Sequence, residues 1–392
     1  MKSHFNFART PEIIFGVGKL LELKDLVANY GSRVLLLTGS RSIKQSDRYD
    51  VLLGSLKAKG IHYSLREIHR EPSPGDVDSI VGDFPTDIPD VVVALGGGSV
   101  LDAGKAVSAM LGKPESVADY LEEVGTKIPE GSKVPFIAVP TTAGTGSEAT
   151  KNAVLSEVGP NGYKKSLRHN NFVPDIALVD PELSLNCPPA VTAASGLDAF
   201  TQLLESYVSK KASPLTDSLA YTGINSMKDN LIPAATTGAL NLDVRTGMSY
   251  AALLSGITLA NAGLGIVHGL AAAIGSYYDI PHGVICGTLV GVSTRSNIEY
   301  LRKDKKANIR YLRKYAEIGK LLLGNICENV DQCCDYLIMK IDRWVESLNM
   351  PRLGKYGFSE NDIEKIADAT SIKFNPVNLK QKDIQEIILE RI

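Results

Sequence analysis

Two histidines and one aspartate are the side chains whose types and spacing point most directly to chemistry. His268 and His282 are the only histidines in the C-terminal half, and each is followed directly by glycine. Asp198 and Gln202 lie four residues apart in a segment with helical periodicity, which places both on one face of a helix. One carboxylate and two imidazoles suit Zn²⁺ or Fe²⁺ and leave a coordination position for a substrate oxygen. The alternative is a pair of hydrogen-bonded core histidines, and spacing alone does not decide between the two.

A glycine turn between a buried strand and a helix is the second feature. Residues 96–98 are glycines, the first of which ends the apolar run DVVVALG (90–96), and Ser99 is placed to cap the next helix. Glycines let a phosphate approach the backbone, and the start of a helix favours an anion. PTTAGTGSEAT (140–150) brings hydroxyl groups to the same predicted edge, where ligands of open α/β sheets bind. The two loops together predict a dinucleotide site, whereas the glycines alone would also fit a plain tight turn.

The end of the second expected strand bears on the choice of dinucleotide. LLLTGSRS (35–42) ends in Gly39, Ser40 and Arg41, without the acidic residue that typically holds the ribose hydroxyls of NAD(H). Ser40 and Arg41 can bind a 2′-phosphate instead, which favours NADP(H) over NAD(H). A solvated surface arginine is the alternative interpretation.

The elements that must position these residues fall into two halves with different periodicity. Residues 1–185 alternate β-branched runs with helical patterns, which indicates a Rossmann-like parallel sheet. The expected strands are 33–38, 62–67, 90–96, 135–140, 149–158 (with a hairpin as one option) and 175–180, and the expected helices between them are 47–59, 75–83 and 99–112. The later helices are 191–208, 214–230, 243–262, 266–276, 284–299, 306–323, 328–348 and 360–369. We therefore expect an α/β dinucleotide-binding domain over residues 1–185, an all-α domain over 186–392 and a ligand cleft between them.

Composition restricts the partners of the chain. Its 392 residues carry a net charge of −2 without a long basic run, so a small molecule is expected rather than nucleic acid or an anionic membrane. The N-terminus lacks the apolar segment of a secretory signal, and five cysteines form no CxxC pair, which predicts a cytoplasmic protein with free thiols. The uncharged stretch 246–278 is long enough to span a membrane, but its glycines and other small residues favour two closely packed buried helices.

Five segments resemble the iron-containing (group III) alcohol dehydrogenase family, in the family's order and spacing and along essentially the whole chain. They are GGGSVLDAGKA (96–106), PTTAGTGSEAT (140–150), PDIALVDPEL (174–183), GLDAFTQLLESYVS (196–209) and HGLAAAIGSYYDIPHG (268–283). The resemblance implies the two-domain fold shared with dehydroquinate synthase, one divalent metal ion (Fe²⁺ or Zn²⁺) and metal-assisted hydride transfer between a nicotinamide and a small alcohol or aldehyde. It also implies that Asp198, His268 and His282 are the metal ligands and that the chain forms a homodimer or larger homo-oligomer.

By motif position, the resemblance also assigns cofactor contacts. The residues expected at the phosphates and the neighbouring ribose are Gly97, Gly98, Ser99, Thr141 and Thr142. Thr145 would approach the nicotinamide, and Asp102 would hold the loop or the nicotinamide amide. Lys164 resembles the family lysine near the nicotinamide ribose, with Lys165 as its rival by one position.

Two positions depart from the family pattern. Gln202 stands where many members have a fourth ligand histidine, so we expect at most a weak fourth ligand there. Ala272 stands where many members place a histidine near the substrate, which leaves hydroxyls, water or the cofactor ribose to carry the proton. These departures keep open a metal-independent reductase of the maleylacetate reductase type and a non-catalytic nucleotide-binding homologue. A cyclase like dehydroquinate synthase would need basic residues near the metal motifs, and few occur there.

Overall fold

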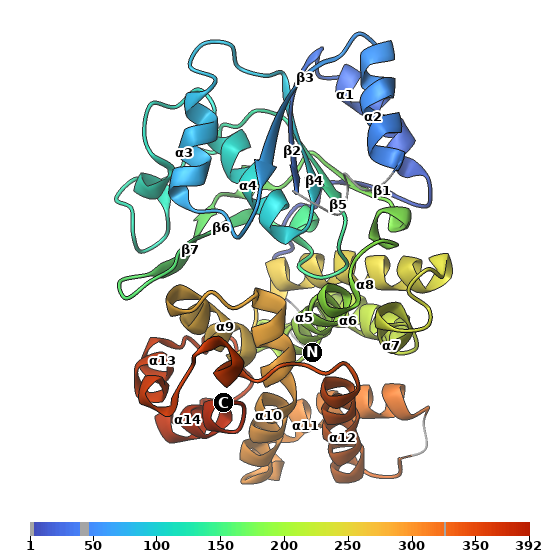
Figure 1. Cartoon of the computed structure of the whole chain (residues 1–392). Coiled ribbons are helices and arrows are strands. Elements are labelled where there is room, and N and C mark those ends of the chain that lie inside the picture. Colours follow the sequence, from blue (N-terminus) through green and yellow to red (C-terminus); the bar gives the residue numbers. More distant parts are fainter. Residues whose placement is uncertain (1–3, 40–46, 325–326) are drawn as a thin grey trace.

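The computed structural model describes residues 4–39, 47–324 and 327–392 (Figure 1). An α/β part, drawn in blue to green, stands above a part in which every described element from Pro189 onward is helical. The N-terminal segment lies against the helices, because the Ala8 N–H donates a hydrogen bond to Asn261 Oδ1 at 2.6 Å. Ala8 therefore lies beside the helical part, shortly before the chain enters the sheet at Glu12.

Six parallel strands form one sheet. Across the sheet they run β1 (Glu12–Phe15), β8 (Ile176–Val179), β5 (Phe136–Pro140), β4 (Val91–Gly96), β2 (Arg33–Gly39) and β3 (His62–Ile68). Strands β4 and β5 are buried at every residue, as a parallel sheet covered on both faces requires. Helices α1 (Leu23–Ala28) and α2 (Asp47–Ala58) pack on one face, and α3 (Pro74–Gly82) and α4 (Gly98–Met110) pack on the other.

A two-stranded antiparallel hairpin, β6 (Asn152–Glu157) and β7 (Tyr163–Arg168), stands apart from the sheet. Of the two predictions for residues 149–158, a further strand or part of a hairpin, the structure shows the hairpin. The side chain of Lys164 runs over the backbone of Gly275 in α9 (Ile266–Tyr277), where a Cβ atom would lie 3.3 Å from Lys164 Cδ. The hairpin thus connects the α/β part to the helical part.

The helical part is built around one buried helix, α5 (Pro189–Val208). The other helices are α6 (Pro214–Met227), α7 (Leu231–Ala235), α8 (Leu242–Ala262), α9, α10 (His282–Arg302), α11 (Lys305–Leu323), α12 (Val330–Ser347), α13 (Ile363–Ala369) and α14 (Gln381–Leu389). From Gly196 to its last residue α5 is buried throughout, and it contacts α6, α8 and α10. A side chain on α5 is therefore shielded from water on all sides unless a cleft reaches it.

The uncharged stretch forms α8 and α9. Gly263 joins them with φ +69°, and a Cβ atom there would lie 2.4 Å from the ring of Phe374, so glycine is required at this turn. Among the described residues no single helix is long and apolar enough to cross a membrane; α8 and α9 pass that test only as a pair, which is bent by 95°. Both helices contribute to the core, as expected for two packed buried helices.

One expectation about the cysteines is wrong. Cys327 and Cys333 form a disulfide, whereas five free thiols were expected from the lack of a CxxC pair. The six-residue separation escapes that motif, yet the turn into α12 brings the two Cα atoms to 5.4 Å, within the normal range for a disulfide. Cys187, Cys286 and Cys334 are free and buried.

Candidate active site

A cleft of about 900 Å³ lies between the carboxyl edge of the sheet and the helices. Its sheet-side lining includes Gly97, Gly98, Ser99, Asp102, Thr142 and Thr145, and its helix-side lining includes Gln202, His268 and His282, with Lys164 from the hairpin. The structure thus brings together most of the residues singled out in the sequence. Thr141 is buried beside them, and Gly39 is the last residue of β2. Ser40 and Arg41 lie outside the described residues.

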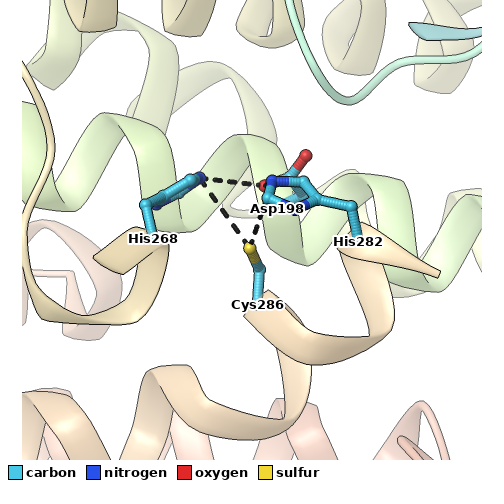
Figure 2. A group of neighbouring side chains, drawn as sticks. All are labelled: Asp198, His268, His282 and Cys286. Carbon is cyan, nitrogen blue, oxygen red and sulfur yellow. Dashed lines mark hydrogen bonds and ion pairs between the residues drawn. The ribbon is translucent and has the colours of Figure 1, made fainter. Parts of the chain in front are cut away.

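Four side chains from three helices converge on one point at the helical side of the cleft (Figure 2). Asp198 of α5, His268 of α9 and both His282 and Cys286 of α10 each offer one ligand atom, and these atoms lie within 4.8 Å of one another. Asp198 Oδ1 is 3.2 Å from His268 Nε2 and 3.8 Å from His282 Nε2. The Asp198 side chain is only 1% exposed, so its charge needs a partner inside the protein.

Glu205, two turns after Asp198 on α5, fixes the orientation of His268. Its Oε2 accepts hydrogen bonds from His268 Nδ1 at 2.7 Å and from the Gly265 N–H at 2.9 Å, and its Oε1 accepts one from the Val267 N–H at 2.7 Å. With a proton held on Nδ1 by Glu205, loss of the Nε2 proton would leave the Nε2 lone pair for a metal ion beside Asp198, the arrangement typical of metal-bound histidines. Glu205 was not anticipated, although its spacing from Asp198 places both on one helix face.

Burial acts differently on the ionisable groups of this cluster. It lowers the pKa of His282 to about 4, against the attraction of Asp198, so this ring is neutral. Burial also disfavours the charged form of His268, but the Cys286 sulfur and the hydrogen bonds to Asp198 and Glu205 outweigh it and raise the pKa. For Asp198, the two histidines overcome burial and lower the pKa, so the group is a carboxylate.

The donor set fits a divalent transition-metal ion. It combines an ionised carboxylate, two imidazole nitrogens and a sulfur, and the buried negative charge calls for a cation. Nδ1 of His282 is buried without a hydrogen-bond partner among the described residues, and Nε2 is the ring nitrogen that faces Asp198 and Cys286. Asp198, His268 and His282 are the residues that would hold the ion.

The two positions that depart from the family pattern are also placed. Gln202 is 3% exposed, and its Oε1 accepts a hydrogen bond from the Ser255 hydroxyl at 2.7 Å. That oxygen is the atom that would bind a metal ion. Ala272 is exposed and lies one helical turn after His268 on α9.

On the opposite side, the glycine turn packs tightly against the threonine loop. A Cβ atom on Gly98 would lie 2.5 Å from Thr145 Cγ2, and one on Gly97 would lie 3.4 Å from Thr142. The prediction that Ser99 caps this helix is wrong. Helix α4 begins at Gly98 with Gly97 as its N-cap, so Ser99 lies inside the first turn. Gly97 already supplies the extended backbone that precedes a helix, so no capping side chain is used.

Asp102 and Lys105 hold the threonine loop, Asp102 from the cleft lining and Lys105 from behind it. Asp102 accepts hydrogen bonds from the Ser147 hydroxyl at 2.5 Å and from the Val154 N–H at 3.1 Å, which matches the first of its two expected roles. Lys105 is buried and donates to the carbonyls of Ser147 and Asn152 at 2.9 and 2.8 Å. The loop is therefore anchored by two ionisable groups, of which Asp102 also lines the cleft and Lys105 is buried behind it.

The structure separates the two rival lysines. Lys164 lines the cleft, and its Nζ lies 2.5 Å from Glu71 Oε2, which also accepts from the Ser156 hydroxyl at 3.0 Å. Lys165 pairs with Glu123, and its side chain is 35% exposed, compared with 7% for Lys164. Glu71 was not anticipated, because only the hairpin brings it beside Lys164.

A parallel sheet with a glycine turn at its carboxyl edge, facing an all-helical part, defines the structural class. The family model described as iron-containing alcohol dehydrogenase matches residues 10–181, and the model for the C-terminal part of the Fe-containing alcohol dehydrogenase family matches residues 192–392. The chain therefore belongs to the iron-containing alcohol dehydrogenase family, and the resemblance read from its motifs is confirmed.

Individual relatives agree with this assignment. The chain is 32% identical to the NADPH-dependent butanol dehydrogenase of Clostridium saccharobutylicum, over 97% of this chain and 96% of the relative. It is 27% identical to the NAD-dependent methanol dehydrogenase of Bacillus methanolicus, over 98% of each. An archaeal halo-thermophilic alcohol dehydrogenase from a Red Sea brine pool shares the fold, with a TM-score of 0.89 and 26% identity over 100% of this chain and 99% of that one.

Membership supports an alcohol oxidoreductase activity and implies a divalent metal ion and a nicotinamide cofactor. The expected fold class, a parallel-sheet N-terminal part with a helical C-terminal part, is confirmed by these neighbours and by the strand order. The relatives named above use different nicotinamides, so membership does not choose between NAD(H) and NADP(H).

Proposed function

We propose that the chain is a metal-dependent, NAD(P)-linked alcohol dehydrogenase or aldehyde reductase that acts on a small alcohol or aldehyde. The observation that supports this most is the convergence of Asp198, His268 and His282 in a cleft whose opposite wall is the glycine turn. Fe²⁺ or Zn²⁺ would be held by these three side chains. When bound, the ion would supply a Lewis acid for the substrate oxygen, and the nicotinamide would exchange the hydride.

The chain's own residues would bind and orient the reactants. Gly97 and Gly98 line the cleft at the start of α4, where free N–H groups favour an anion and would bind the cofactor phosphates. Thr142 and Thr145 line the same wall, with Thr141 buried behind them. Holding the reacting carbons in one fixed geometry lowers the entropic part of the barrier.

Other residues would set the electrostatics of the cleft. Glu205 holds His268 in one tautomer, and Lys164 would contact the ribose on the nicotinamide side. The described side chain at position 272 is alanine, so a cleft hydroxyl, water or the cofactor ribose would carry the proton to or from the substrate oxygen.

The choice of NADP(H) over NAD(H) is a further part of this proposal. Strand β2 ends in Thr38 and Gly39, and the sequence continues with Ser40 and Arg41, without a carboxylate to repel a 2′-phosphate. A reduced NADP(H) pool would favour aldehyde reduction. We also propose that residues 1–185 bind the dinucleotide and residues 186–392 the metal, in a cytoplasmic homodimer or larger homo-oligomer.

Initial rates of NADPH and NADH oxidation with a panel of short aldehydes test this function. The protein is stripped with a chelator and then reloaded anaerobically with Fe²⁺ or Zn²⁺, with Asp198→Asn treated in parallel. We expect the stripped protein and the Asp198→Asn variant to be inactive, and one metal to restore the wild-type rate with NADPH preferred.

Each other outcome has a distinct meaning. Equal rates before and after stripping would overturn the metal-dependent mechanism and favour a reductase of the maleylacetate reductase type. A preference for NADH would overturn only the role proposed for Ser40 and Arg41 and would leave the metal-dependent mechanism intact. Turnover under none of the conditions would leave a non-catalytic nucleotide-binding homologue.

A further inference from the structure

Cys286 lies among the metal donors, although no motif in the sequence pointed to it. Its Sγ is 3.6 Å from His282 Nε2 and 3.8 Å from His268 Nε2. In a tetrahedral zinc site, bonds of ~2.3 Å to sulfur and ~2.0–2.1 Å to nitrogen place the two ligand atoms about 3.5 Å apart. Both observed separations are close to that value, so one ion could contact the sulfur and both rings.

The position of Cys286 follows from helix geometry. His282 and Cys286 are four residues apart at the start of α10, so both side chains lie on the same helix face toward Asp198 (Figure 2). Cys286 is fully buried, yet its nearest functional groups are a carboxylate and two imidazoles. A buried thiol is more often packed as a small apolar group.

Gln202, the other residue that would complete the ligand set, is engaged elsewhere. Its amide oxygen, the only metal-binding atom that it has, accepts the hydrogen bond from Ser255 of α8. One of the two lone pairs of this oxygen is therefore directed at Ser255, whereas the Cys286 sulfur is already directed at both imidazole nitrogens. Cys286 is thus better placed than Gln202 to act as the fourth donor.

We propose that Cys286 is a protein ligand of the metal ion, so that the site consists of one aspartate, two histidines and one cysteine. The inference rests on the proposed function, in which Asp198, His268 and His282 hold a divalent ion. A thiolate is a soft ligand, so this set favours Zn²⁺ over Fe²⁺. The protein would then supply four ligands, and a substrate oxygen would have to add to them as a fifth.

Cobalt spectroscopy on the full-length protein tests the sulfur contact directly. Metal-free protein is titrated with Co²⁺, whose visible bands report binding and whose near-ultraviolet sulfur-to-cobalt band reports a thiolate ligand. Wild type and Cys187→Ser, a matched control at another buried free thiol, should show both bands. Cys286→Ser should lose the sulfur band and bind Co²⁺ at least tenfold more weakly, roughly the scale seen when a metal site loses a supporting group.

The outcomes separate this inference from the function on which it rests. Visible bands without the sulfur band in wild type would overturn the Cys286 ligand and leave the three-ligand site intact. Failure of wild type to bind Co²⁺ or Zn²⁺ at all would overturn both. If the thermal unfolding midpoint of metal-free Cys286→Ser shows that it does not fold, X-ray absorption of zinc-loaded wild type decides, because a sulfur neighbour at ~2.3 Å is then required.

Discussion

The two walls of the cleft are built on different principles. On the sheet wall, shape dominates, because glycines and threonines form much of the surface, and the ionisable Asp102 and Lys105 are both hydrogen-bonded to the threonine loop. On the helical wall, charge dominates, because the side chains that converge at the cleft are themselves ionisable and are buried or half-buried. Backbone contacts therefore suit the sheet wall to a phosphate-bearing ligand, whereas the helical wall suits a cation.

The comparison predicts which kind of substitution damages each wall. The sheet wall should be sensitive to added volume, and the helical wall to lost charge or hydrogen bonds. The following variants are ordered from the largest expected effect to the smallest.

Glu205→Gln, on the helical wall, should cause the largest effect of these variants, a loss of metal affinity. The amide cannot accept at both positions now filled by Gly265, Val267 and His268, so the imidazole loses its fixed orientation. We expect affinity for Zn²⁺ or Fe²⁺ to fall about 10- to 100-fold, as for other groups that orient a metal ligand. Competition with a chelating dye measures it. Glu317→Gln is the control, because Glu317 accepts a hydrogen bond from Tyr207, which lies on the same helix as Glu205, and this variant should bind metal normally. Equal metal affinities in the two variants would contradict the prediction.

Glu148→Gln tests the ionisable groups behind the sheet wall. Burial raises the pKa of Glu148 to about 7, although its own backbone and Lys105 act to lower the pKa. Between the ordinary pKa of a glutamate and about pH 7, Glu148 is ionised in the unfolded chain but still protonated in the folded protein. The free energy of unfolding of the wild type therefore falls as the pH rises through this range, and it stops falling above about pH 7. Relative to wild type, Glu148→Gln should therefore gain about 2 kcal/mol between about pH 5 and about pH 7. Urea unfolding across that range measures the difference, and a constant difference would show that the group is already ionised.

Gly98→Ala tests volume on the sheet wall. The added methyl would lie 2.5 Å from Thr145 Cγ2, so the start of α4 or the threonine loop must move. We expect nucleotide affinity to fall about tenfold, or about 1.4 kcal/mol, while metal affinity is unchanged. Titration by nucleotide fluorescence measures the change. Gly54→Ala in α2, where nothing lies within 4 Å of the added atom, is the matched control; a metal defect in Gly98→Ala would show that the walls are not independent.

The sequence predicted long, strongly patterned elements better than short ones. Strands and helices with strong patterns were placed within a few residues, such as β4 at Val91–Gly96 for an expected 90–96. The four-residue edge strand β1, with two exposed and two half-buried residues, has no alternating pattern and was missed, as were the short helices α1 and α7 and the C-terminal helix α14. Short elements carry too few residues to show a period.

The site shows the same limit. Asp198, His268 and His282 could be proposed because they lie in recognisable motifs. Glu205, Glu71 and Cys286 could not be assigned, because their partners come from other helices or from the hairpin. Spacing identifies residues on one helix face, but only packing shows what that face meets. Helical walls are thus harder to read from sequence than glycine turns, whose function depends on neighbouring residues in the chain.

Lys164 belongs to neither wall, because the hairpin carries it between them, and it should show the smallest effect. Its ammonium pairs with Glu71 and, against the effect of burial, lowers the pKa of that carboxyl. Lys164→Met should raise the KM for the nicotinamide about fivefold, the scale of one ordinary hydrogen bond. The neighbouring Lys165, which pairs with Glu123, provides the control, and Lys165→Met should leave the KM unchanged. Adding Glu71→Gln to Lys164→Met separates the two causes. If the KM recovers, the unpaired glutamate caused the defect; if it stays high, the lysine itself contacts the cofactor, and the hairpin completes a site that neither wall forms alone.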